Sequence, residues 1–186
     1  MRFLLALAIL PLSAAVVDRI AVVVGTTVIT ETEVVEEARM AAFLNQSAPD
    51  VGPEARRAAA ERLVDQQLIR NEMRIGAYPQ PTGAEIDDML GNLQKEHFGG
   101  DEARYRAALT KYGISEDQLR RHIAWQLATI RFTDLRFSPA VAGIPDGNGQ
   151  SANRAAPGAD VDQQMESWLK QTRAATKVQF KPGAFQ

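Results

Sequence analysis

The 186-residue chain contains no cysteine, and this absence excludes several kinds of chemistry at once. Without a thiol, the chain cannot form a disulfide framework, a thiolate zinc site, a cysteine nucleophile or a lipid-anchored N-terminal cysteine. A charge imbalance is missing as well, because 21 basic side chains stand against 23 acidic ones. No block of like charge interrupts this balance, so the composition does not indicate binding to nucleic acid or to an anionic membrane surface.

The sequence also lacks the motifs of nucleotide-dependent, metal-dependent and hydrolytic enzymes. It has no GxSxG, no P-loop and no GxGxxG. The histidines His97 and His122 lie on separate predicted helices, and neither has a second ligand at a metal-binding spacing such as HExxH. The neighbouring Asp87 and Asp88 would point about 100° apart on a helix, so they do not form a facing acid and base. We therefore predict no cofactor, no metal and no catalytic residue.

The one long apolar run stands at the N-terminus, in MRFLLALAILPLSAA. Arg2 precedes the apolar residues 3–12, and the small residues Ser-Ala-Ala follow, which is the pattern of a cleaved secretory signal peptide. The run has about half of the roughly 20 residues that a membrane span needs. We predict cleavage between Ala15 and Val16, which leaves 20 basic and 23 acidic residues and a net charge of −3. The alternatives are an uncleaved anchor or a buried helix.

The next residues predict a β-hairpin that leads into a helix. Residues 20–24 and 28–29 are β-branched and apolar, and Gly25-Thr26 between them suits a two-residue turn. Thr30 and Glu33 then have the spacing of a capping box at a helix start, and Thr82 and Glu85 form a second capping box further along the chain. We expect helices at about 31–45, 53–76, 83–97, 102–112, 115–137 and 160–176, and a last short strand at 177–180.

With 45% hydrophobic residues, the chain is large enough for one ordinary domain with a core. The fold class we predict is mainly α: an irregular helical domain of about six helices, with a small N-terminal β-hairpin joined by a C-terminal strand. In the helix 53–76, one face carries Ala60, Leu63, Val64, Leu68 and Ile75, and the opposite side carries Ile69 and Met73.

The helix 115–137 is apolar on two sides and should therefore be central or have a second partner. One face carries Leu119, Ile123, Leu127, Ile130 and Phe137, and the other carries Trp125, Ala128, Phe132 and Leu135. The second face is the best candidate for an exposed groove, although Trp168 of the last helix could instead cover it.

Residues 138–160 read SPAVAGIPDGNGQSANRAAPGAD, with three prolines, four glycines and no aromatic residue. This composition offers too little large apolar surface to offset the entropy of ordering, so we expect a mobile linker over 138–159. A flexible chain of this length spans about 26 Å as a root-mean-square distance. The helix and strand after it are too short to be stable alone, so we expect them to dock back on the preceding domain.

Three segments together carry a resemblance to a known family: VVDRIAVVVGTTVITETEV, AAERLVDQQLIRNEMRIG and ISEDQLRRHIAWQLATIRF. They resemble the N-terminal domain of SurA-type periplasmic chaperones, and MESWLKQTRAATKVQF is similar to the last helix and strand of that family. The resemblance covers about residues 16–137 and 160–181. In the relatives, one or two parvulin-type prolyl isomerase modules stand between the long helix and the last helix. Here the predicted linker takes their place.

The resemblance implies a signal peptide at 1–15, a chaperone domain at 16–137, a linker at 138–159 and a docking C-terminal segment at 160–186. It further implies an exported, periplasmic holdase without ATP, metal or other cofactor. The mature chain would not insert stably in the membrane and would bind neither nucleotide nor nucleic acid. Its clients would be unfolded secreted proteins and, by analogy with the family, outer-membrane β-barrel proteins.

Methionine and aromatic side chains adapt to varied partners, so they are the candidate client-binding residues; the alternative for each of them is ordinary core packing. Two other functions stay open. One is a peptidyl-prolyl isomerase with residual or lost activity, and the other is an envelope assembly subunit with one fixed partner. The candidate client-binding residues are Met40, Phe43, Met73, Trp125, Phe132 and Trp168.

Overall fold

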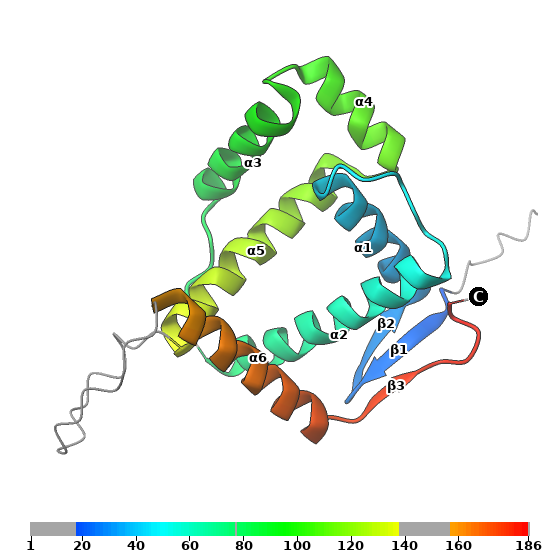
Figure 1. Cartoon of the computed structure of the whole chain (residues 1–186), viewed down its shortest axis with the longest axis vertical. Helices are drawn as coiled ribbons and strands as arrows, with labels where there is room; N and C mark the ends of the chain where they lie inside the picture. The colour runs from blue at the N-terminus through cyan, green and yellow to red at the C-terminus, as the bar shows by residue number, and fades with distance from the viewer. Residues whose placement is uncertain (1–17, 77, 138–156, 186) are drawn as a thin grey trace, which may run out of the picture.

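The computed structural model describes residues 18–76, 78–137 and 157–185 (Figure 1). The predicted signal peptide, its cleavage between Ala15 and Val16, and residues 138–156 of the predicted linker lie outside the described residues. The predicted mainly α fold with a small sheet is confirmed. The elements are β1 (Ile20–Val24), β2 (Thr27–Thr30), α1 (Glu31–Leu44), α2 (Pro53–Ile75), α3 (Gly83–Phe98), α4 (Glu102–Tyr112), α5 (Glu116–Phe137), α6 (Pro157–Ala175) and β3 (Val178–Phe180).

The sheet has three antiparallel strands in the order β2-β1-β3. In the hairpin, Val24 pairs with Thr27, and Gly25 in the turn has a φ of 59°, which glycine adopts without steric cost. On the other edge of β1, Val22 pairs with Phe180 of β3. The C-terminal strand thus joins the N-terminal hairpin, as predicted, and red β3 lies beside blue β1 in Figure 1.

Both predicted capping boxes are present. The backbone N–H of Glu33 donates to the Thr30 hydroxyl oxygen at 3.3 Å, and the Thr30 N–H donates to the Glu33 carboxylate at 2.7 Å. Thr82 and Glu85 repeat this arrangement at the start of α3. These reciprocal bonds satisfy backbone N–H groups that the first turn of a helix leaves free, so local sequence sets where α1 and α3 begin.

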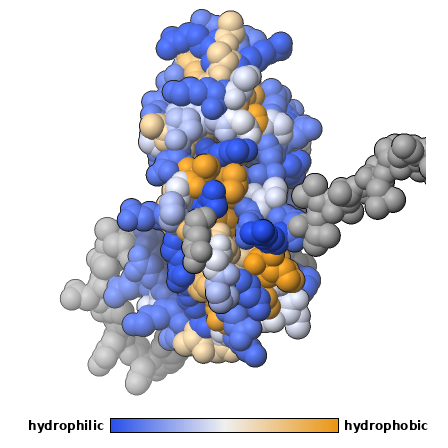
Figure 2. Space-filling model, turned by 90° about the vertical axis from the view of Figure 1, so that its right-hand side faces the viewer, coloured by the Kyte–Doolittle hydropathy of each residue, from blue (hydrophilic) through white to orange (hydrophobic). Residues whose placement is uncertain are grey.

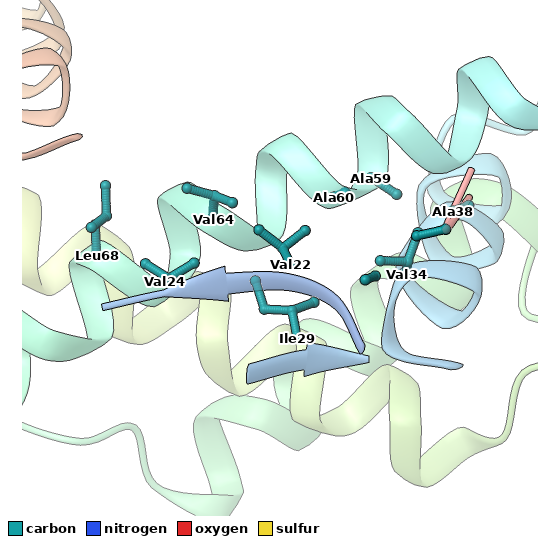
Figure 3. Packing of buried hydrophobic residues seen from close by; sticks show 11 residues of the cluster. Val22, Val24, Ile29, Val34, Ala38, Ala59, Ala60, Val64 and Leu68 are labelled. Carbon is teal, nitrogen blue, oxygen red and sulfur yellow. The ribbon is translucent and has the colours of Figure 1, made fainter. Parts of the chain in front are cut away.

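The sheet packs against one side of α2 (Figure 3). Val22 and Val24 of β1 point toward Val64 and Leu68 of α2, and all four side chains are at most 1% exposed. Full burial of a side chain of this size contributes about 1.5–3 kcal/mol. Small Ala59 and Ala60 occupy the next turn of α2, which lets the strand and the helix approach closely.

Helices α2 and α5 are the two longest elements, and the other helices pack around them. Helix α2 packs against α1, and α3 and α4 pack against α5 and α1 respectively as an arm on one side of the molecule (Figure 1). Helix α6 crosses the opposite end and contacts both α2 and α5. On the face drawn in Figure 2, hydrophobic residues form separate patches between hydrophilic ones.

Both sides of α2 carry buried residues. Ile75, which shares the apolar face of Val64 and Leu68, is 83% exposed, whereas Ile69 on the opposite side is buried among Phe132 and Phe137. The reason is that α2 has two partners. Its Val64 side meets the sheet, its Ile69 side meets α5, and its last residue extends beyond both.

The two-sided packing of α5 is present, but each face also carries an exposed residue. Ile130 is 53% exposed and Leu135 is 44% exposed, whereas Phe137 at the end of the Ile130 face is buried. Helix α6 begins at Pro157, three residues before the predicted boundary at residue 160. Proline lacks the N–H that the first helical turn does not need, so it suits this position.

No helix in the described part of the chain is both long enough and apolar enough to cross a membrane.

Candidate client-binding cleft

A cleft of about 250 Å³ lies between α1, α2 and α5, and we call it the central cleft. Helices α1 and α2 pack against each other, and residues of all three helices line the cleft. Its apolar lining consists of Met40, Leu63, Ile114 and Trp125. Its polar and charged lining consists of Glu33, Glu36, Glu37, Gln66, Arg70, Gln118, Arg121 and His122.

Trp125 of α5 stands at one end of the central cleft, where it meets Arg70 of α2. The guanidinium carbon of Arg70 lies 4.6 Å from the centroid of a Trp125 ring, within the range of a cation–π contact. Burial lowers the pKa of Arg70, and the charges of Glu33 and Glu37 oppose that shift. The guanidinium lies over the indole and donates to the side-chain oxygen of Gln66 at 3.2 Å.

A second hollow of about 360 Å³, the outer groove, continues on the other side of this pair. Trp125 and Arg70 line it too, together with Met73 and Arg74 of α2 and Ala128 of α5. Trp125 and Arg70 thus form a wall shared by the two hollows. A partner chain that displaced Arg70 from the indole would find an adaptable surface made of an indole and a thioether.

The electrostatics of the central cleft centre on His122. Burial lowers the pKa of His122; the carboxylate of Glu37 raises it and the guanidinium of Arg62 lowers it further. Arg62 also donates a hydrogen bond to Glu37 at 2.9 Å, so the Glu37 carboxylate interacts with both Arg62 and His122. At neutral pH His122 is therefore a neutral, half-buried ring in the wall of the cleft.

Three of the six predicted client-binding residues are core residues. Met40, Phe43 and Phe132 are 5%, 2% and 0% exposed, so a partner chain cannot wrap around any of them while the domain is folded. Phe132 contacts Tyr78, Phe137 and Trp168, with ring centroids 5.1, 5.9 and 5.5 Å away. Core packing, the alternative left open for each residue, accounts for the burial of these three positions, although Met40 also lines the central cleft.

The other three predicted residues are half-buried, and they divide between two places. Trp125 and Met73 line the outer groove. Trp168 lies instead on the Phe132 part of the second face of α5, which α6 covers. The sequence left two interpretations of that face, an exposed groove or a face covered by Trp168, and each applies to one part of it. The Trp125 end borders open hollows, and the Phe132 end is covered by Trp168.

Sequence reasoning missed Arg70 and gave His122 no role. No sequence signal marks Arg70, because its contact with Trp125 joins two residues on different helices that are more than fifty positions apart in the chain. In the described residues, no group of three or more histidine or acidic side chains is placed to hold a metal ion. Asp87, from the acidic pair considered above, forms an ion pair with Arg120 of α5 at 2.5 Å.

Comparisons with known proteins place this chain beside two curated chaperones. It is 29% identical over 181 residues to "Chaperone SurA" of Dechloromonas aromatica, an alignment covering 91% of this chain and 41% of that protein. It is 34% identical over 151 residues to "Chaperone SurA" of Chromobacterium violaceum, covering 74% of this chain and 34% of that protein. No family model matches the chain.

The chain spans less than half the length of these relatives. The similarity covers most of this chain, 91% in one alignment and 74% in the other. The predicted resemblance to the SurA chaperones, over a part of their length, is confirmed.

Proposed function

We propose that the chain is a holdase chaperone that binds unfolded secreted or outer-membrane polypeptides, without ATP, at the wall shared by the central cleft and the outer groove. Trp125 would be the main contact, with Met73 beside it and Arg70 as a movable cover. The carrying observation is that Trp125 lines both hollows although large aromatic residues elsewhere on α5 are buried. The similarity to two proteins named as chaperones supports the same class of function.

The mixed lining suits weak and reversible binding. An indole and a thioether provide apolar contact area, while three glutamates and two arginines keep the central cleft hydrated and prevent a dry, tight interface. A client that must later fold elsewhere needs rapid release, and release rates account for most differences in affinity between related complexes.

Aggregation of an unfolded outer-membrane protein, followed by light scattering, tests this proposal. We expect the chain to suppress aggregation and Trp125→Ala to raise the concentration needed for half suppression by about three- to tenfold, the usual effect of losing an aromatic anchor. Ile130→Ala is the matched control, because Ile130 is an exposed apolar residue of the same helix that lines neither hollow. Equal suppression by all three proteins would remove the cleft from the proposal.

We further propose that the chain does not catalyse proline isomerisation. A proline isomerisation assay at catalytic protein concentrations should give the uncatalysed rate. A rate increase that scaled with protein concentration would favour the isomerase alternative. A pull-down that returned one stoichiometric partner instead of many unfolded chains would favour the assembly-subunit alternative.

A further inference from the structure

A separate hollow of about 410 Å³ lies between α4 and the C-terminal ends of α1 and α3, and we call it the α4 cup. Its aromatic lining is Phe43 of α1, Phe98 of α3 and Tyr112 of α4. Phe43 stacks on Phe98 with ring centroids 5.9 Å apart and meets Tyr112 edge to face at 5.6 Å. The Tyr112 hydroxyl donates to the backbone carbonyl of Ser47 at 2.6 Å, which fixes that ring. Phe43 and Tyr112 are buried, so they hold the half-buried Phe98 ring in place, and Phe98 is the aromatic side chain that a ligand can reach here.

The charged side chains that line the α4 cup include two cations and no carboxylate. Arg104 and Lys111 of α4 line it, and no carboxylate is among its lining residues, all of which the structure describes. Within the described part of the chain, neither cation forms an ion pair. The ammonium of Lys111 lies 5.3 Å from the Tyr112 ring centroid, at the border of the aromatic surface. By contrast, three glutamates line the central cleft.

The spacing of the two cations sets the size of a matching ligand. Arg104 and Lys111 are seven residues apart, or about 10 Å along the axis of α4. Ala107 and Ala108 lie between them in the lining and leave room for a large side chain. A side chain seated midway lies about 5 Å along this axis from the backbone of either cationic residue. An extended peptide rises about 3.3 Å per residue, so a carboxylate one or two residues from that side chain can reach Arg104 or Lys111.

We propose that the α4 cup binds a short segment of an unfolded polypeptide in which an aromatic or large aliphatic side chain stands one or two residues from an acidic one. The apolar side chain contacts Ala107, Ala108 and Phe98, and the carboxylate pairs with Arg104 or Lys111. The inference rests on the proposed function in one respect, that the occupant is an unfolded chain. It concerns a different surface, and it adds a charge preference that the central cleft does not have.

The test is an NMR titration of the ¹⁵N-labelled chain with the peptide acetyl-Gly-Ser-Gly-Phe-Glu-Gly-Ser-Gly-amide. The amide signals of Ala107 and Ala108 should shift and saturate with a Kd on the order of 0.1–1 mM, as expected for one apolar and one charged anchor. Replacing Glu by Gln, or Phe by Ala, in the peptide should weaken binding at least about fivefold. Raising the salt concentration should weaken it as well, because the cations are exposed.

Reversing the charge of the two cations that line the α4 cup distinguishes this proposal from non-specific binding. The variant Arg104→Glu/Lys111→Glu should bind the Phe-Glu peptide about tenfold more weakly. Lys170→Glu on α6, an exposed cation that lines none of the hollows described here, should bind it as the unaltered chain does. Circular dichroism melting of each variant shows whether the fold is intact.

Three outcomes would overturn the proposal. The Gln peptide could bind as well as the Glu peptide. A peptide ending in Phe with a free carboxylate and no Glu could bind much better, which would assign the α4 cup to chain ends. The Ala107 and Ala108 signals could shift with protein concentration alone, which would assign it to a second copy. Trp125→Ala should leave peptide binding here unchanged, so failure of the central-cleft proposal and failure of this one are distinguishable.

Discussion

The guanidinium carbon of Arg70 lies 4.6 Å from the centroid of a Trp125 ring, and this contact joins α2 to α5 where the central cleft meets the outer groove. Both side chains belong to amphipathic helices, and neither is part of the buried core. The contact therefore stabilises the two helices while it leaves a face of the indole within reach of a partner. Any client that uses Trp125 competes with Arg70 for the same ring.

This competition gives opposite effects on stability and on binding for one substitution. Arg70→Ala removes the cation–π contact and should lower the free energy of unfolding by about 0.5–1 kcal/mol. The same change uncovers Trp125 and should lower the concentration needed for half suppression of client aggregation. Urea unfolding and light scattering measure the two effects. In a double-mutant cycle with Trp125→Ala, the coupling energy for stability should be of the same size, and a coupling near zero would contradict the contact.

Phe132 tests the distinction between core and groove on the other part of α5. Its side chain is 0% exposed and contacts Tyr78, Phe137 and Trp168. Phe132→Ala should therefore cost about 3–5 kcal/mol of stability, measured by chemical unfolding. Ile130→Ala, at a position 53% exposed two residues earlier, should change stability by less than about 0.5 kcal/mol. If Phe132→Ala remained stable but lost client binding, the assignment of Phe132 to the core would be wrong.

The C-terminal segment offers a test of how the ends of the chain hold each other. Truncation after Gln171 removes β3, which pairs with β1, and Arg173, which forms ion pairs with Glu61 and Asp65 of α2. It also removes Phe180 and Phe185, over which the Arg57 guanidinium lies at 3.9 and 5.7 Å from the ring centroids. We expect a lower melting temperature with a transition that stays cooperative. An unchanged melting temperature would mean that the segment contributes nothing to the fold.

The truncation also frees the second edge of β1. An unpaired strand edge is a site for pairing with other chains, so the truncated protein should self-associate at concentrations where the full chain does not. Size-exclusion chromatography at several concentrations measures this. A matched variant with Phe180→Ala keeps the backbone pairing of β3 and should lose stability without the same gain in self-association.

The sequence predicted best those features that depend on residues close together in the chain. The capping boxes at Thr30 and Thr82 and the turn at Gly25 depend on residues at most three positions apart, and the structure contains all three. Errors began where an outcome depended on a distant partner. Ile75 satisfies the periodicity of α2 yet is exposed, because helical periodicity says nothing about where the sheet beside the helix ends.

The candidate sites show the same limit. A list of methionine and aromatic residues included Trp125 and Met73, but it could not separate them from Phe43 and Phe132, which have the same chemistry and lie in the core. Arg70 and the cations of the α4 cup were absent from that list because their roles arise from neighbours on other helices. Burial and contact across helices, not residue type, decide which apolar side chains a partner can reach.

The half-buried ring of His122 should make stability depend on pH. Burial lowers its pKa in the folded state below the ordinary value of 6.5, so between these two values the unfolded chain binds more protons than the folded one. Stability should therefore fall as the pH drops from about 7.5 to about 5.5. Among the surrounding charges, Glu37 of α1 raises the pKa of His122 and Arg62 of α2 lowers it further.

His122→Gln isolates this effect from all other titrating groups. Glutamine does not titrate, so the variant should lose less stability than the unaltered chain over the same pH range, as measured by urea unfolding at each pH. His97→Gln removes the other histidine of the chain and should keep the slope that His122 causes. Equal pH dependence of the unaltered chain and His122→Gln would show that the ring is protonated as easily in the folded state as in water. In that case the ring beside Glu37 would become charged as the pH falls below the ordinary value of 6.5, and the wall of the central cleft would gain a cation in that range.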